Sequence, residues 1–173
     1  MPQQENRYTA IGYSVPASPS KLRVYVWRKL RQMGAENVKP GLAVLPENTE
    51  NRRMLAELAE IVREMGGESS VYTLIFADIA EERALIRLFA QRTKDELEKL
   101  HKQLESVTLS PTNVAANRKL INQVQKTIGN YEKMGAPPDP SVRKEVERAL
   151  RQVMDAVRSL PSFVSEELHD LLK

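Results

Sequence analysis

Apolar residues follow two different periods in the first half of the chain. Residues 8–15 (YTAIGYSV) are rich in β-forming residues and are closed by Pro16, which cannot donate a hydrogen bond to a continuing ladder, so they predict a strand. Residues 21–33 predict a helix that ends at Gly34, because apolar residues recur there at helical spacing. The apolar stripe of this helix consists of Leu22, Val26, Leu30 and Met33.

The following segments complete an alternation of strands and helices. Ser18 is the expected N-cap of the first helix, with Pro19 in its first turn. The next elements are two short strands separated by a Pro-Gly turn, a second helix and a last strand, at residues 37–39, 42–46, 51–65 and 69–77. The order βαββαβ favours a ferredoxin-like α+β fold, with both helices on one face of an antiparallel sheet. Right-handed crossovers place the first and last strands side by side near its middle.

The second half of the chain is predicted to be entirely helical. We expect a ferredoxin-like domain at residues 7–78 and a helical extension at residues 79–173, made of a helix hairpin (79–133), a proline-rich linker (134–140) and further helices (141–173). Three-four spacing predicts a seam in each arm of an antiparallel hairpin. The first seam consists of Ile86, Ala90, Thr93, Leu97, Leu100, Leu104 and Val107, and the second of Val114, Asn117, Ile121, Val124, Ile128 and Tyr131. This region is a candidate arm for a homodimer or other homo-oligomer.

Composition excludes several kinds of site. The 173 residues contain no cysteine and only two histidines, His101 and His169, which argues against a thiolate or histidine metal site. No P-loop, GxGxxG or GxSxG motif is present. We therefore predict no catalytic residue, no cofactor, no metal and no enzymatic activity. No apolar run reaches the ~20 residues that cross a bilayer, so the expected protein is soluble and cytoplasmic, without a membrane partner.

Charge is concentrated on the first helix. The chain carries a net charge of only +3, whereas residues 21–31 hold five cations and no acid. These candidate nucleic-acid or anion-binding residues are Lys21, Arg23, Arg28, Lys29 and Arg31. A solvated face and a polyanion contact are equally compatible with this pattern; the bound anion would be DNA phosphate or a small oxyanion. A weaker second candidate is the acid-free stretch 106–131, with Arg118, Lys119 and Lys126.

The single tryptophan, Trp27, lies at the margin of the apolar stripe. A tryptophan in that position is expected to cover a seam between helix and sheet as a core residue, with a stacking role as the alternative.

Residues 13–46 (YSVPASPSKLRVYVWRKLRQMGAENVKPGLAVLP) resemble the N-terminal region of the chromate-resistance regulator ChrB family. The resemblance covers about residues 8–105 and extends more loosely to the central domain of PaaX-type repressors and to CRISPR-associated ferredoxin-like nucleases. It is carried by Arg23, Trp27, Arg28 and Leu30 in the helix, Gly34-Ala35 in the turn, and Gly41, Leu45 and Pro46 in the strand pair.

This resemblance implies a bacterial cytoplasmic protein that controls chromate-responsive genes through DNA contact by its N-terminal region. The nuclease relatives have an aspartate at the end of the first strand, where this chain has Ser14-Val15-Pro16, so metal-dependent cleavage is disfavoured. The alternative function is a protein–protein or dimerisation module without DNA binding.

Overall fold

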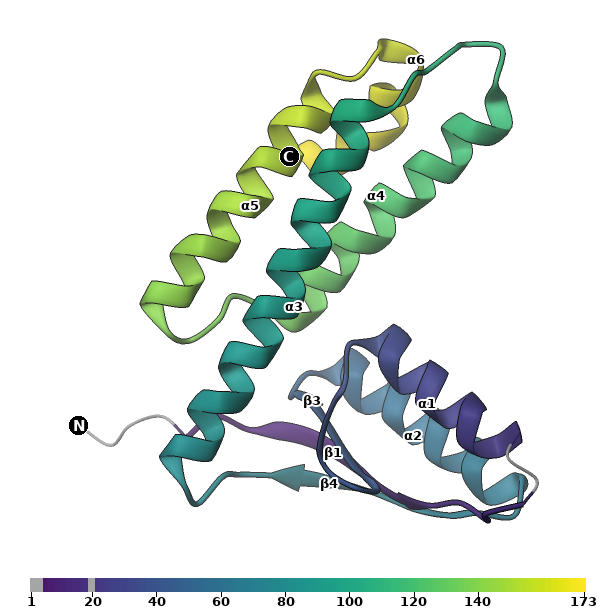
Figure 1. Cartoon of the computed structure of the whole chain (residues 1–173), viewed down its shortest axis with the longest axis vertical. Helices are drawn as coiled ribbons and strands as arrows, with labels where there is room; N and C mark the ends of the chain where they lie inside the picture. Colours follow the sequence, from purple (N-terminus) through teal and green to yellow (C-terminus); the bar gives the residue numbers. More distant parts are fainter. Residues whose placement is uncertain (1–4, 19–20) are drawn as a thin grey trace. The chain divides into compact units, whose positions relative to one another are not determined.

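The structure, a computed structural model, describes residues 5–18 and 21–173. It confirms a mixed α+β chain in which a four-stranded antiparallel sheet with helices precedes a helical region (Figure 1). The chain divides into two compact units, Met1–Leu85 and Ile86–Lys173. The elements of the sheet-containing part are β1 (Tyr8–Ser14), α1 (Lys21–Met33), β2 (Glu36–Lys39), β3 (Leu42–Pro46), α2 (Thr49–Glu64) and β4 (Glu68–Leu74).

The strands form one antiparallel sheet in the order β2-β3-β1-β4, which is the predicted ferredoxin-like arrangement. On β1, Ile11 is opposite Ala43 of β3 and Val71 of β4. The first and last strands are neighbours, as expected. However, β4 occupies an edge rather than the middle of the sheet, because the β2–β3 hairpin pairs with the other side of β1 and leaves β4 a single neighbour.

The hairpin turn has the backbone that its sequence predicts. Gly41 adopts φ +75°, the left-handed region that glycine enters without steric cost. Its carbonyl accepts a hydrogen bond of 2.7 Å from the Tyr13 amide, and a Cβ at this position would lie 2.6 Å from the Tyr13 carbonyl oxygen. Gly41 therefore allows β1 and the turn to approach closely.

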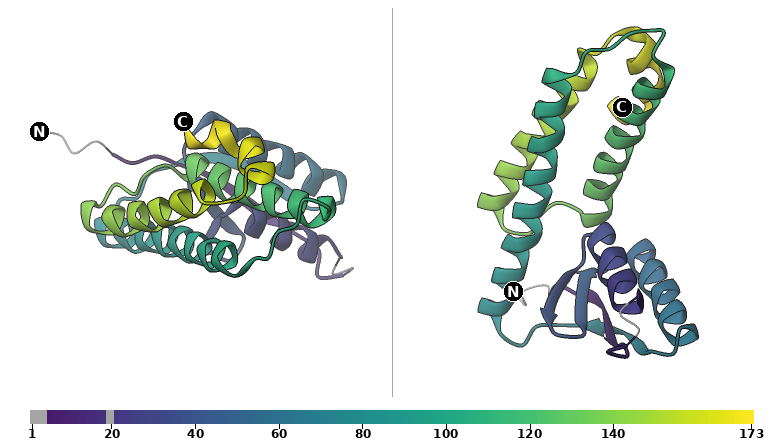
Figure 2. Two further views of the ribbon diagram at one scale, coloured as in Figure 1. Left: turned by 90° about the horizontal axis from the view of Figure 1, so that it is seen from above. Right: turned by 45° about the vertical axis from the view of Figure 1, so that its right-hand side comes forward.

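Helices α1 and α2 cover the same face of the sheet (Figures 1 and 2). Of the stripe predicted for α1, Leu22, Val26 and Leu30 are buried and Met33, in the last turn, is partly buried. Burial of Leu22, Val26 and Leu30 between helix and sheet stabilises the unit by roughly 1.5–3 kcal/mol for each side chain. Helix α2 is also joined to the sheet by a hydrogen bond of 2.6 Å, which the Ser69 hydroxyl of β4 donates to the Ala59 carbonyl.

The two helices of this unit differ in how their starts are defined. Asn48 is the N-cap of α2, and its Oδ1 accepts a hydrogen bond of 2.7 Å from the Asn51 amide. For α1, the described helix begins at Lys21. The capping turn predicted from Ser18 and Pro19 depends on Pro19 and Ser20, which lie outside the described residues.

The last strand is shorter than predicted. It ends at Leu74 rather than at residue 77, because Leu74 pairs with Tyr8, the first residue of β1, where the described pairing of the two strands ends. Phe76 instead packs its ring edge-on against the ring of Tyr8, with 5.4 Å between centroids. The Tyr8 hydroxyl donates a hydrogen bond of 3.1 Å to Glu82, and burial, followed by this carboxylate, raises the pKa of Tyr8.

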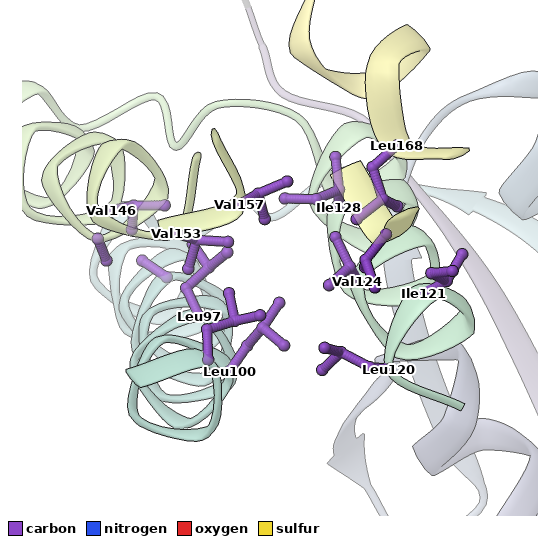
Figure 3. Close-up of a cluster of buried hydrophobic side chains, with 14 residues drawn as sticks. Leu97, Leu100, Leu120, Ile121, Val124, Ile128, Val146, Val153, Val157 and Leu168 are labelled. Carbon is purple, nitrogen blue, oxygen red and sulfur yellow. The ribbon is translucent and has the colours of Figure 1, made fainter. Parts of the chain in front are cut away.

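The second unit is a set of helices around its own apolar core (Figure 3). Its elements are α3 (Ile79–Ser106), which crosses the boundary between the units, α4 (Val114–Met134), α5 (Pro140–Arg158), α6 (Ser162–Ser165) and the 3₁₀ helix η1 (Glu166–Leu172). The last part of the predicted helical extension is this 3₁₀ segment, and its Leu168 is fully buried. Most predicted seam residues are buried, but Val114 is 62% exposed because it starts α4, beyond the core.

Two glutamines connect α3 and α4. The amide of Gln103 donates to Gln123 at 3.0 Å, and the amide of Gln123 donates back to Gln103 at 2.6 Å. A reciprocal pair of this kind satisfies both amides only at one register of the two helices. The pair therefore fixes how the predicted hairpin is aligned.

Two features are absent from the described residues, a membrane-spanning helix and a cluster of metal-ligating side chains. No helix in the described part of the chain is long and apolar enough to span a bilayer. Within residues 5–18 and 21–173, no group of three or more histidine, cysteine or acidic side chains is arranged to hold a metal ion.

A candidate polyanion-binding face on the first helix

The five predicted cations all lie on α1, and the structure places them around the sides of the helix that do not pack on the sheet. Four of them are exposed and Lys29 is half-buried. The buried stripe of α1 holds the helix against the sheet, so the direction of the cations is fixed by the same residues that build the core. We call this surface the α1 cationic face; it consists of Lys21, Arg23, Tyr25, Trp27, Arg28, Lys29 and Arg31.

Cations and aromatic side chains alternate on this face in two columns. Residues four apart lie above one another on a helix, which places Lys21, Tyr25 and Lys29 in one column. The second column consists of Arg23, Trp27 and Arg31. At about 100° per residue, the two columns run along opposite flanks of the buried stripe.

Each column contains a direct contact between a cation and an aromatic ring. The Lys29 ammonium lies 5.6 Å from the centroid of the Tyr25 ring, and the Arg31 guanidinium lies 5.3 Å from that of Trp27. Such contacts are worth about 0.5–1 kcal/mol at exposed sites. They hold the Lys29 and Arg31 side chains along the helix surface, over the rings of Tyr25 and Trp27.

The expectation that Trp27 is a core residue is wrong. Its side chain is 54% exposed, because it lies on the flank of the stripe rather than within it, and the neighbouring Val24 is 47% exposed. The sequence contained the signal for its actual environment, namely a cation four residues before and four residues after it. Tyr25, which was not predicted as a site residue, also has a cation four residues before and after it, but its side chain is partly buried.

The cations of α1 differ from those of α2 in their partners. In the first unit, the described salt bridges join Arg52 to Glu47, Arg53 to Glu57 and Arg63 to Glu60, and none of these bridges involves an α1 side chain. Uncompensated like charges on one helix repel each other by a few tenths of a kcal/mol per pair. A bound polyanion removes that repulsion.

The shape of the face distinguishes between anions. The charges lie on two flanks of a convex helix and diverge from one another, whereas a small oxyanion is bound by donors that converge on one point. An extended chain of phosphates can contact diverging cations at successive positions. The geometry therefore favours a polyanion over a single oxyanion.

Replacement of Trp27 by alanine is expected to lower the free energy of unfolding by about 0.5–1 kcal/mol, because it removes an exposed contact with Arg31 and no core packing. A core tryptophan would cost about 3–5 kcal/mol. Urea denaturation followed by circular dichroism measures the difference, and Leu30→Ala on the same helix is the matched buried control. A loss of several kcal/mol in Trp27→Ala would show that the indole is part of the core.

Comparison with known proteins gives one match. Residues 23–108 match the family model described as Protein ChrB, N-terminal, which covers about half of the chain. No curated protein and no solved structure matches the chain. The match begins at Arg23 and includes the other helix, turn and strand residues that carry the resemblance, so that resemblance is confirmed and associates the chain with chromate resistance.

Proposed function

We propose, from the match of residues 23–108 to the ChrB N-terminal domain, that this is a regulatory protein of chromate resistance. In this proposal it acts in transcriptional control in the cytoplasm, and the α1 cationic face contacts DNA. The protein has no enzymatic activity in this proposal. The absence of catalysis in this proposal is supported by carboxylates such as Glu57 and Glu60, which form ion pairs on the surface.

The observation that carries the proposal is the alternation on one helix of aromatic rings with cations that form none of the described salt bridges. Arginine and lysine supply salt-dependent affinity for phosphates without reading sequence. The rings of Tyr25 and Trp27, covered on one side by Lys29 and Arg31, offer planar surfaces to the sugars of the DNA backbone. A surface whose only role is solubility requires charged side chains but not the aromatic rings of Tyr25 and Trp27.

Binding to a fluorescent duplex, followed by anisotropy between about 50 and 200 mM salt, tests the proposal. If three arginines of α1 contact phosphates, they contribute about 2.7 to the magnitude of the slope of log K against log salt. A parallel titration with chromate, followed by calorimetry, tests the small-oxyanion alternative. Failure to bind any duplex at low ionic strength would sink the proposal.

A protein partner is the second candidate, and the exposed pair Val24 and Trp27 favours it. Tryptophan and arginine are enriched at the centres of protein interfaces. A homo-oligomer through the heptad-like helices has less support, because Leu97, Leu100 and Leu104 are already buried inside the second unit. Sedimentation of the wild type and of Trp27→Ala separates the cases: a dimer formed through α1 would dissociate in the variant.

A further inference from the structure

The α4 helix carries a second surface with no acidic residue. Between Val114 and Tyr131 its sequence contains three cations and several amides but no aspartate or glutamate. The exposed members of this surface, which we call the α4 basic face, are Arg118, Lys119, Asn122, Gln125 and Lys126.

Helical spacing gathers these side chains on the side of α4 that faces away from the core. Lys119, Asn122 and Lys126 recur at i, i+3 and i+7, in line and opposite the buried stripe. Arg118 and Gln125 form a parallel row beside them. The stripe itself packs into the helical core through Leu120, Ile121, Val124 and Ile128 (Figure 3).

The three cations of this face form none of the salt bridges described in the unit. Those bridges join Lys94 to Glu145, His101 to Glu105, Arg158 to Asp155 and Lys173 to Asp170. Arg118, Lys119 and Lys126 are exposed to solvent and have no acidic partner among these described bridges.

The side-chain chemistry of the face identifies its partner. We propose that the α4 basic face binds the phosphate backbone of double-stranded DNA. Arginine, lysine and side-chain amides are the usual donors to phosphate oxygens. From Arg118 to Lys126 the α4 basic face spans about 12 Å along the helix axis, a length over which a duplex presents about seven phosphate charges.

Two other macromolecules fit the face less well. Single-stranded nucleic acids are bound through aromatic stacking, and the only aromatic residue of α4, Tyr131, is partly buried against the core. Protein interfaces contain an aromatic or aliphatic centre. The α4 basic face has neither, in contrast to α1 with its exposed Trp27.

This proposal extends the proposed function from the first unit to the second, and rests on it only in naming DNA as the partner. The variant Arg118→Gln/Lys119→Gln/Lys126→Gln removes the three charges, and glutamine keeps a similar helix propensity. The control Lys94→Gln/Arg158→Gln/Lys173→Gln removes three charges of the same unit that lie in salt bridges. Both variants lower the formal net charge from +3 to 0.

Anisotropy titrations of the full chain, at several salt concentrations and with duplexes of unrelated sequence, measure the effect. The α4 variant is expected to bind every duplex about 10- to 100-fold more weakly at low salt and to lose about 2.7 from the magnitude of the salt slope. The control is expected to change affinity less than threefold.

Three outcomes would overturn the proposal: a wild-type chain that binds no duplex, an α4 variant that behaves like the control, or an effect confined to single-stranded RNA or DNA. Variants of α1 distinguish this failure from that of the proposed function. If the α1 variant loses affinity while the α4 variant does not, the proposed function stands and the α4 contact fails. The reverse result would place the DNA contact on α4 alone.

Discussion

Replacing Arg23, Arg28 and Arg31 together by glutamine is expected to weaken binding to duplex DNA by about 100-fold at low salt. Each exposed contact between arginine and phosphate is taken as about 1 kcal/mol after solvent screening, and about 1.4 kcal/mol is a factor of ten in affinity. Three contacts therefore amount to roughly two orders of magnitude. Fluorescence anisotropy at about 50 mM salt measures the change.

The matched control for this variant removes three arginines that have partners. Arg52, Arg53 and Arg158 form salt bridges with Glu47, Glu57 and Asp155, and their replacement by glutamine also lowers the formal net charge from +3 to 0. If affinity depends on contact by α1, the control binds within about threefold of the wild type. Equal losses in both variants would mean that net charge alone attracts DNA, and that α1 has no special role.

Replacement of Leu168 by alanine is expected to destabilise the helical unit by about 2–5 kcal/mol, the usual range for a leucine lost from a packed core. Leu168 is fully buried and belongs to the core formed with α3, α4 and α5, although it lies on a 3₁₀ segment near the end of the chain (Figure 3). Urea denaturation monitored by circular dichroism measures the change in the free energy of unfolding.

His169→Ala is the control for this prediction, since His169 is the exposed neighbour of Leu168 on the same segment. It should change stability by less than about 0.5 kcal/mol. If Leu168→Ala were equally harmless, η1 would be a loosely attached end rather than a part of the core.

Sequence periodicity was sufficient to predict features that depend on a single helix or strand. The stripe of Leu22, Val26 and Leu30 predicted both the existence of α1 and the face that it buries. The cations of the candidate site were predicted for the same reason, because a residue on the far side of a known stripe has to face away from the core. The βαββαβ order then left few ways to arrange the strands.

Features that depend on two elements were not predictable in this way. Trp27 lies at the border of its stripe, where burial depends on whether a neighbouring element covers that flank, and no periodicity of α1 contains this information. The reciprocal bonds of Gln103 and Gln123 depend on the register between α3 and α4. The end of β4 was set by the length of its partner β1, not by its own β-forming residues.

The segment that matches the family model is not a segment that can fold alone, because β1 lies inside the sheet but outside the match. The family match starts at residue 23, after β1, and ends at residue 108, just after α3. A fragment cut at these limits would leave β3 and β4 without the strand that joins them, so the sheet would fall into a hairpin and a single strand. It would also expose Leu97, Leu100 and Leu104 to water. Recombinant fragments of this protein should therefore begin before Tyr8 and retain α4, α5 and η1, even when only the matched segment is of interest.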